Sequence, residues 1–172
     1  MTKRPESSEY APYYGKYIAL VPDGDLSVVL NRQIDATAGL LSPLSEQEAN
    51  YAYAPGKWSI KEVLGHLIDS ERVFAYRALR IARNDKTPLP GYEQDDYVAT
   101  AKFNGRSLSG LLDEFVVVRR ASTELFKNFT EEEWQRRGTA NQTEVTVRSL
   151  GYIIAGHELH HMDIVRNRYL GR

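Results

Sequence analysis

The chain has no cysteine among its 172 residues, which excludes disulfides, a cysteine nucleophile and any thiolate-ligated metal or iron–sulfur cluster. An excess of charge of one sign is also missing, because 22 Lys and Arg residues face 23 Asp and Glu residues, for a formal net charge of −1. Nucleic-acid-binding proteins carry a basic surface that neutralises phosphates. The composition therefore predicts no nucleic-acid partner.

Long hydrophobic runs are absent as well. No stretch approaches the roughly 18 apolar residues of a membrane helix, and the N-terminal residues lack the apolar segment of a secretory signal. The lack of cysteine suits a reducing compartment. These absences predict a cytoplasmic protein without membrane contact. The length and the 42% of hydrophobic residues predict a single domain over residues 1–172 with its own core.

Four segments place apolar residues at the spacing of an amphipathic helix: residues 25–41, 60–83, 108–129 and 146–169. The best-marked start is at Ser59, because Glu62 three residues further on completes a capping box and Trp58 and Val63 occupy the two hydrophobic-staple positions. Four helices of about 17 to 24 residues are what a bundle needs. The sequence therefore predicts an all-α protein, a four-helix bundle.

The connections predict smaller elements. Residues 84–106 form a long link that contains a short helix at 93–101, and a link of this length lets the third long helix run parallel to the second. Capping boxes that begin at Ser45 and Thr130 predict short connecting helices of one or two turns. The tyrosine-rich residues 1–20 are expected to form an N-terminal arm laid over the bundle. The chain shows no convincing strand.

The chain has only four histidines, and three of them lie within five residues in the last predicted helix. On a helical wheel His157 and His161 lie on the inward face, whereas His160 falls toward its edge. Two imidazoles one turn apart can bind the same ion, and His66 is the only other histidine that could add a third ligand. Core histidines hydrogen-bonded to other groups are the alternative. A bound metal would explain why all three of these histidines face the interior of the bundle.

Residues 157–161 also match H-E-x-x-H, the zinc-protease motif in which the glutamate is the general base. Such enzymes usually take a third ligand from downstream, yet only eleven residues follow His161 and none is histidine. Ile164 and Asn167 stand where the extended motif requires glycine and histidine. We therefore do not interpret this segment as a protease site.

Glu71 falls inside the apolar arc of the helix at 60–83, where a carboxylate is costly unless it is paired. It is either a buried partner for an arginine or tyrosine of a neighbouring helix, or a catalytic residue that accepts the free N–H of a ligand histidine or carries a proton. Glu158 is expected to be solvated or to lie beside the ligands, rather than to act as a base. The end of this helix is expected to be solvated, because it carries a run of basic residues that suits the helix dipole: Arg77, Arg80, Arg83 and Lys86.

With these residues assembled, the chain resembles the DinB/YfiT-like superfamily of metal-binding four-helix bundles over nearly its whole length. The segment KWSIKEVLGHL at 57–67 looks like the family's W-S-x-x-E-x-x-x-H-L helix start, and HELHH at 157–161 looks like its H-x-x-H-H. The resemblance implies an up-down-down-up helix order, zinc or nickel as the metal, and often a homodimer. It implies as metal ligands His66, His157 and His161, with His160 as a non-ligand.

A metal with three neutral histidine ligands keeps positions for water or substrate. It can activate a water for hydrolysis or a thiol for group transfer, and the residues alone do not choose. The resemblance favours a low-molecular-weight-thiol S-transferase, because characterised members of the superfamily use such thiols. The expected partners are then a small-molecule thiol and an electrophilic substrate. A metal-dependent hydrolase and a non-enzymatic metal-binding or dimerisation bundle remain the alternatives.

Overall fold

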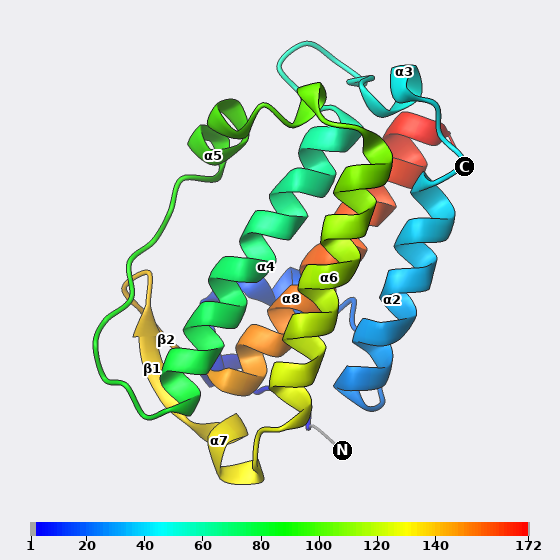
Figure 1. Ribbon diagram of the computed structural model, residues 1–172. Helices are drawn as coiled ribbons and strands as arrows, with labels where there is room; N and C mark the ends of the chain where they lie inside the picture. Colours follow the sequence, from blue (N-terminus) through cyan, green and yellow to red (C-terminus); the bar gives the residue numbers. More distant parts are fainter. Residues whose placement is uncertain (1–2, 172) are drawn as a thin grey trace.

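A computed structural model describes residues 3–171 of the protein. Four long helices lie side by side (Figure 1): α2 (Leu26–Leu41), α4 (Ile60–Ala82), α6 (Leu108–Lys127) and α8 (Val147–Ile164). Helices α2 and α4 each pack against both α6 and α8. Figure 1 shows α2 and α8 running in one direction and α4 and α6 in the other. The predicted four-helix bundle and its up-down-down-up order are confirmed.

The long helices begin where the sequence predicts, because each has a side-chain cap. At the start of α4 the Ser59 hydroxyl accepts a hydrogen bond from the Glu62 N–H at 3.1 Å, and the Glu62 carboxylate accepts one from the Ser59 N–H at 2.7 Å. The last helix continues as a π-helix, η4 (Val165–Leu170), and stops at Gly171, whose φ of 64° favours glycine. The other helices are capped by Asp25, Ser107 and Thr146.

The link between α4 and α6 returns along the bundle, so that these two helices run parallel (Figure 1). It contains α5 (Gln94–Ala101) and η3 (Phe103–Gly105), and the predicted short helix is confirmed. The two other short connecting helices are also present, α3 (Glu46–Ala49) and α7 (Glu131–Gln135). Each of them begins with a capping box, as the sequence predicts.

The absence of strands was a wrong prediction. Strands β1 (Arg137–Ala140) and β2 (Thr143–Thr146) form an antiparallel hairpin. The hairpin holds the long link, because Leu89 N–H donates to Thr139 O and Asn141 N–H donates to Leu89 O, both at 2.9 Å. Its turn places Asn141 and Gln142 at φ values of 49° and 61° without a glycine. Four-residue strands without a glycine turn give almost no sequence signal.

The N-terminal arm lies along α8, which confirms its prediction for the part that is described, residues 3–20. Its elements are η1 (Ser7–Glu9), η2 (Pro12–Tyr14) and α1 (Gly15–Ile18), and α1 packs on α8. A Cβ atom at Gly156 would lie 2.0 Å from the backbone oxygen of Tyr17. Only glycine at this position lets the arm come so close to α8, one residue before His157.

The core consists of two hydrophobic clusters with polar side chains between them. One cluster includes Leu30, Phe74 and Leu150, and the other includes Leu64 and Phe115. Along each long helix, buried polar residues fall between members of the two clusters: Gln33 and Thr37 on α2, His66, Ser70 and Glu71 on α4, Arg119, Ser122 and Thr123 on α6, His157 and Glu158 on α8. No helix within residues 3–171 is long and apolar enough to span a bilayer.

Candidate metal site

The three histidines predicted as ligands come together between α4 and α8. His66 Nε2 lies 3.1 Å from His157 Nε2, and His161 Nε2 lies 3.0 Å from the same atom. The potential ligand atoms of all three residues lie within 4.8 Å of one another. His160 does not belong to this group, and its ring packs instead on Tyr17 at a centroid distance of 5.1 Å.

Hydrogen bonds among the imidazoles do not account for this arrangement. A neutral imidazole nitrogen carries either one hydrogen or one lone pair, so His157 Nε2 cannot form two good hydrogen bonds with His66 and His161 at once. A tetrahedral ion with bonds of 2.0–2.1 Å would hold its ligand nitrogens about 3.4 Å apart. The observed separations of 3.1 and 3.0 Å are close to that value. The three nitrogens therefore fit a metal ion.

Burial keeps these imidazoles neutral. It lowers the pKa of His66 to about 4 and that of His161 to about 3. The pKa of His157 lies well below its usual value, through burial first and then through its histidine neighbours. Only a neutral imidazole has a free lone pair for a metal. At neutral pH the chain thus presents the protonation state that metal binding requires.

Neighbouring side chains hold the imidazoles in place. With its proton on Nδ1, His66 donates to Ser70 Oγ at 3.3 Å, and Tyr92 from the long link donates to the same oxygen at 2.7 Å. The Trp58 ring lies 4.8 Å from the His66 ring, and the Tyr17 ring lies 5.3 Å from the His157 ring. A partner on Nδ1 leaves Nε2 of His66 directed at the other two histidines, as in known metal sites.

Two cavities reach the histidine group, one at His157 and the other at His161. One of about 250 Å³ is lined by His157, the arm and the long link. The other, of about 310 Å³, is lined by His161, Trp58 and Tyr169. A small molecule in either cavity would contact the site, which is the arrangement of a reactive metal centre rather than of a closed structural one.

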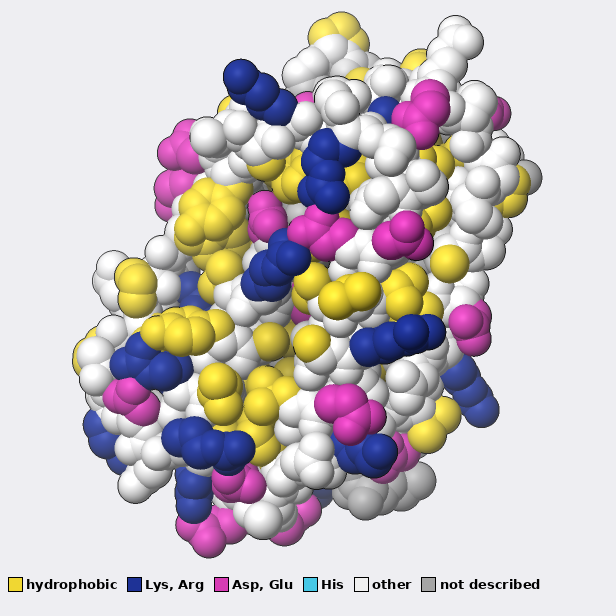
Figure 2. Space-filling model, in the orientation of Figure 1, with side chains coloured by type: hydrophobic (Ala, Val, Ile, Leu, Met, Phe, Trp, Pro, Cys, Tyr) yellow, Lys and Arg dark blue, Asp and Glu magenta, His cyan; other side chains and the backbone are white. Residues whose placement is uncertain are grey.

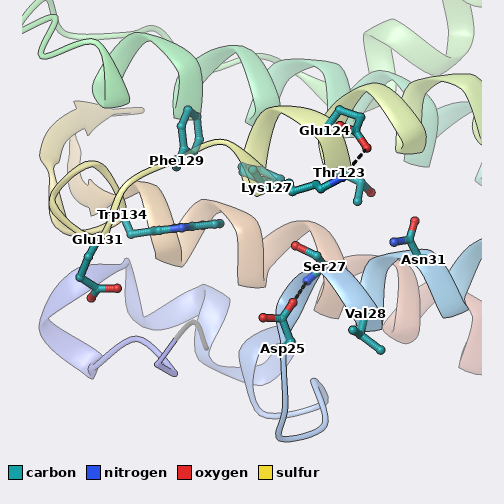
Figure 3. A pocket seen from close by; sticks show the side chains of 11 residues that line it. Asp25, Ser27, Val28, Asn31, Thr123, Glu124, Lys127, Phe129, Glu131 and Trp134 are labelled. Atoms are coloured by element: carbon teal, nitrogen blue, oxygen red, sulfur yellow. Dashed lines mark hydrogen bonds and ion pairs between the residues drawn. The ribbon is translucent and has the colours of Figure 1, made fainter.

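A third cavity, of about 430 Å³, lies between the start of α2, the end of α6 and α7 (Figure 3). None of its lining residues is a histidine. Figure 3 shows the Asp25 carboxylate hydrogen-bonded to the Ser27 N–H, which caps α2. The Trp134 ring lies along one wall of the cavity. This cavity brings together no set of groups typical of a reactive site.

Glu71 is not part of the histidine group, since the group found within residues 3–171 contains no carboxylate. Its two oxygens accept hydrogen bonds from Arg119 Nε at 2.9 and 3.0 Å, and one of them accepts a third from Nη2 at 2.8 Å. The two side chains are 3% and 1% exposed. Of the two interpretations offered by the sequence, the structure matches a buried partner for an arginine.

Glu158 joins the same ion pair and is not solvated, contrary to one of the two expectations for it. Arg119 Nη1 lies 2.5 Å from Glu158 Oε2, and Thr37 donates to Glu158 Oε1 at 2.6 Å. Burial raises the pKa of Glu158 although Arg119 lies beside it. The sequence analysis missed Arg119, yet a signal exists: it shares the inward stripe of α6 with Leu112, Phe115 and Phe126.

The expectation of a solvated basic helix end was wrong for Arg77, which is only 4% exposed. Its guanidinium donates to Pro90 O at 2.6 Å, so the long link covers it. Arg83 and Lys86 are exposed, as expected, and Arg80 pairs with Asp85 near the surface.

The fold and the site define a four-helix bundle with a histidine group that is open to small molecules. The chain matches the family model of the DinB superfamily over residues 30–165 and belongs to that superfamily. A protein of Oceanobacillus iheyensis, named as a candidate metal-dependent hydrolase, is 25% identical over an alignment of 135 residues, and the match covers 73% of this chain and 73% of that one.

Two solved structures share the fold. YfiT from Bacillus subtilis, described as a probable metal-dependent hydrolase with an unusual four-helix bundle topology, has a TM-score of 0.69 at 17% identity, and the match covers 96% of this chain and 93% of that one. The mycothiol-dependent maleylpyruvate isomerase has a TM-score of 0.66 at 12% identity, with 85% of this chain and 62% of that one covered. Likenesses at this identity show the fold.

Proposed function

We propose that His66, His157 and His161 bind one divalent transition metal, zinc or nickel, and that the protein is a metal-dependent enzyme acting on small molecules. The observation that carries this proposal is the convergence of three neutral Nε2 atoms, 3.0 and 3.1 Å apart, at a place that two cavities reach. The relatives from Oceanobacillus iheyensis and Bacillus subtilis support it, since both are described as metal-dependent.

A divalent ion held by three histidines would lower the pKa of a coordinated water or thiol. The residues around the three histidines orient the imidazole rings and enclose them. Ser70 and Tyr92 fix the ring of His66, while Trp58 and Tyr17 cover two of the imidazoles with aromatic surface. No carboxylate of residues 3–171 joins the group, so the group itself supplies no acceptor for a proton lost by the nucleophile.

Our proposed reaction is the transfer of a small thiol to an electrophile. The thiol loses its proton, its sulfur forms a bond with the electrophilic carbon, and the bond from that carbon to its leaving group, for example bromide, breaks and releases the leaving group to solvent. The structural likeness to a mycothiol-dependent enzyme supports this reaction. Hydrolysis is the second candidate, because two relatives are described as hydrolases.

Protein loaded with zinc or nickel should conjugate bacillithiol to monobromobimane faster than the uncatalysed reaction, and the apoprotein should not. The reason is that the imidazoles alone offer no group that deprotonates a thiol at neutral pH, since their pKa values lie far below it. Fluorescence of the conjugate measures the rate. Release of nitrophenol from p-nitrophenyl acetate without thiol tests hydrolysis in parallel. Equal rates with and without metal in both assays would refute both proposed activities and favour a non-enzymatic metal-binding or dimerisation bundle.

The metal-free protein should lose stability as the pH falls from about 6.5 to about 4. Histidines of the unfolded chain bind protons near pH 6.5, whereas the pKa of about 4 for His66 and about 3 for His161 excludes those protons from the folded chain. Each such histidine lowers the free energy of unfolding by about 1.4 kcal/mol per pH unit over this window. Urea unfolding at several pH values measures it, and His161→Gln should reduce the slope by about one proton. An unchanged slope would contradict the buried, neutral state of His161.

The homodimer, the cytoplasmic location, the single domain and the lack of a nucleic-acid partner stay predictions from the sequence. A homodimer would be expected to cover apolar surface. Exposed apolar side chains lie among charged ones on the face of α4 and α6 (Figure 2), where Tyr76, Leu79 and Val117 line a shallow cavity of about 380 Å³.

A further inference from the structure

Arg77 is a buried cation that has no acidic partner in the described part of the chain. Its side chain is 4% exposed, and within residues 3–171 no carboxylate lies within ion-pair distance of its guanidinium. Its neighbours are the Pro90 carbonyl, which accepts a hydrogen bond from Nη2 at 2.6 Å, and the rings of Phe74 and Tyr92, whose centroids lie 5.6 and 5.9 Å from Cζ. Arg119, by contrast, faces two carboxylates.

The guanidinium keeps most of its hydrogen-bonding capacity. An arginine has five N–H donors, and the Pro90 carbonyl takes one of them. The other guanidinium nitrogens of Arg77 are not among the fully buried side-chain atoms of residues 3–171 that lack a hydrogen bond, so they are not sealed in the core. Arg77 lines the cavity of about 250 Å³. Burial of an unpaired charge is costly, and it lowers the pKa of Arg77.

The same cavity leads to the histidine group. Phe74 neighbours both groups, with its ring centroid 5.6 Å from Arg77 Cζ and 6.4 Å from the His157 ring. The distance from the Arg77 guanidinium to the His157 imidazole therefore cannot exceed the sum of these two distances. A small organic molecule can span such a distance. Tyr14 and Tyr92 add aromatic walls.

We propose that Arg77 binds the carboxylate of a small organic acid in this cavity, and that the rest of the acid extends toward the three histidines. The inference rests on the proposed function, because it assigns a substrate class to that site. A guanidinium matches a carboxylate in two parallel hydrogen bonds. The exposed Glu93 and Asp95 also line the cavity, and they disfavour anions of higher charge such as phosphates.

The backbone holds Arg77 ready for such a ligand. Leu89 is fixed to the hairpin through its hydrogen bonds with Thr139 and Asn141, so the next residue, Pro90, presents its carbonyl at a defined place. That carbonyl orients the guanidinium before any ligand binds, which lowers the entropy cost of binding. The hairpin that the sequence did not reveal thus shapes the cavity next to the site.

Benzoate and benzamide test this proposal, because they have nearly the same shape and differ in charge. Calorimetric titration of metal-loaded protein should give an affinity for benzoate about tenfold or more above that for benzamide. Phenylphosphonate should bind more weakly than benzoate. Arg77→Gln should remove the preference for benzoate, Arg77→Lys should keep part of it, and Arg120→Gln, which removes an exposed arginine of α6, should leave it unchanged. Equal affinities in the wild type, or a preference that survives Arg77→Gln, would overturn it, and so would the absence of saturable benzoate binding.

Two further readouts separate this proposal from the metal site and from folding. Metal content is measured on the same samples, so a chain that binds no metal but prefers benzoate through Arg77 would refute the proposed function alone. If Arg77→Gln does not fold, NMR of the wild type decides: the Nε–H signal of Arg77, assigned with Arg77→Lys, should move on addition of benzoate and stay in place with benzamide. A signal that stays in place with both would overturn the proposal.

Discussion

His66→Ala, His157→Ala and His161→Ala are each expected to lose nearly all bound metal, whereas His160→Ala should keep it. Each of the three residues supplies one of the converging nitrogen atoms. Removing even a partner that only orients a ligand costs about 10- to 100-fold in metal affinity, so removing a ligand should cost more than about 100-fold. Elemental analysis of protein purified without a histidine tag measures the metal per chain.

His160→Ala is a closely matched control, because its imidazole lies in the same turn of α8 and packs on the ring of His161 at 5.3 Å. Circular dichroism should show all four variants folded, since the two hydrophobic clusters of the core contain no histidine. Equal metal loss in all four variants, or full metal content in His66→Ala, would refute the assignment of ligands.

The parts of the fold that depend on local sequence could be predicted. Capping at Ser59 and Thr130 depends on residues three apart, and the inward stripes depend on residues three or four apart. The histidine group could be predicted for the same reason. His157 and His161 share a face through their spacing, and the chain has one histidine outside that segment, His66. Their convergence in space rests on the packing of α4 against α8, which the bundle pattern implies.

The features that depend on contacts between distant segments could not be predicted. Arg77 lies in a run of basic residues that is otherwise at the surface, and it is buried because the link at residue 90 returns over it. The path of that link depends on its pairing with the hairpin, between residues about 50 positions apart, and each strand has only four residues. Arg119 is different. The sequence analysis missed it, although its position on the apolar stripe of α6 is a local signal for a buried arginine. Glu71, on its own helix, did predict a buried acid that needs a partner.

Arg119→Met should destabilise the protein by about 3–5 kcal/mol, because it leaves the buried carboxylates of Glu71 and Glu158 without their cation. For a chain of this length the melting temperature should fall by about 10 °C. Thermal and urea unfolding measure the effect. The charge accounts for the loss if the triple variant Arg119→Met, Glu71→Gln, Glu158→Gln regains most of the stability, since neutral side chains of similar size then fill the same space.

The pH dependence of the stability of Arg119→Met independently tests whether unpaired charge causes the loss. Burial already raises the pKa of Glu158, and Arg119 opposes this effect. Without Arg119 the folded-state pKa of Glu158 therefore rises further above that of the unfolded chain. The folded state then binds more protons than the unfolded state as the pH falls, and the stability gap between Arg119→Met and the wild type should narrow from about pH 8 to about pH 5. A gap of the same size at both pH values, with no recovery in the triple variant, would mean that Arg119 stabilises the core by packing alone.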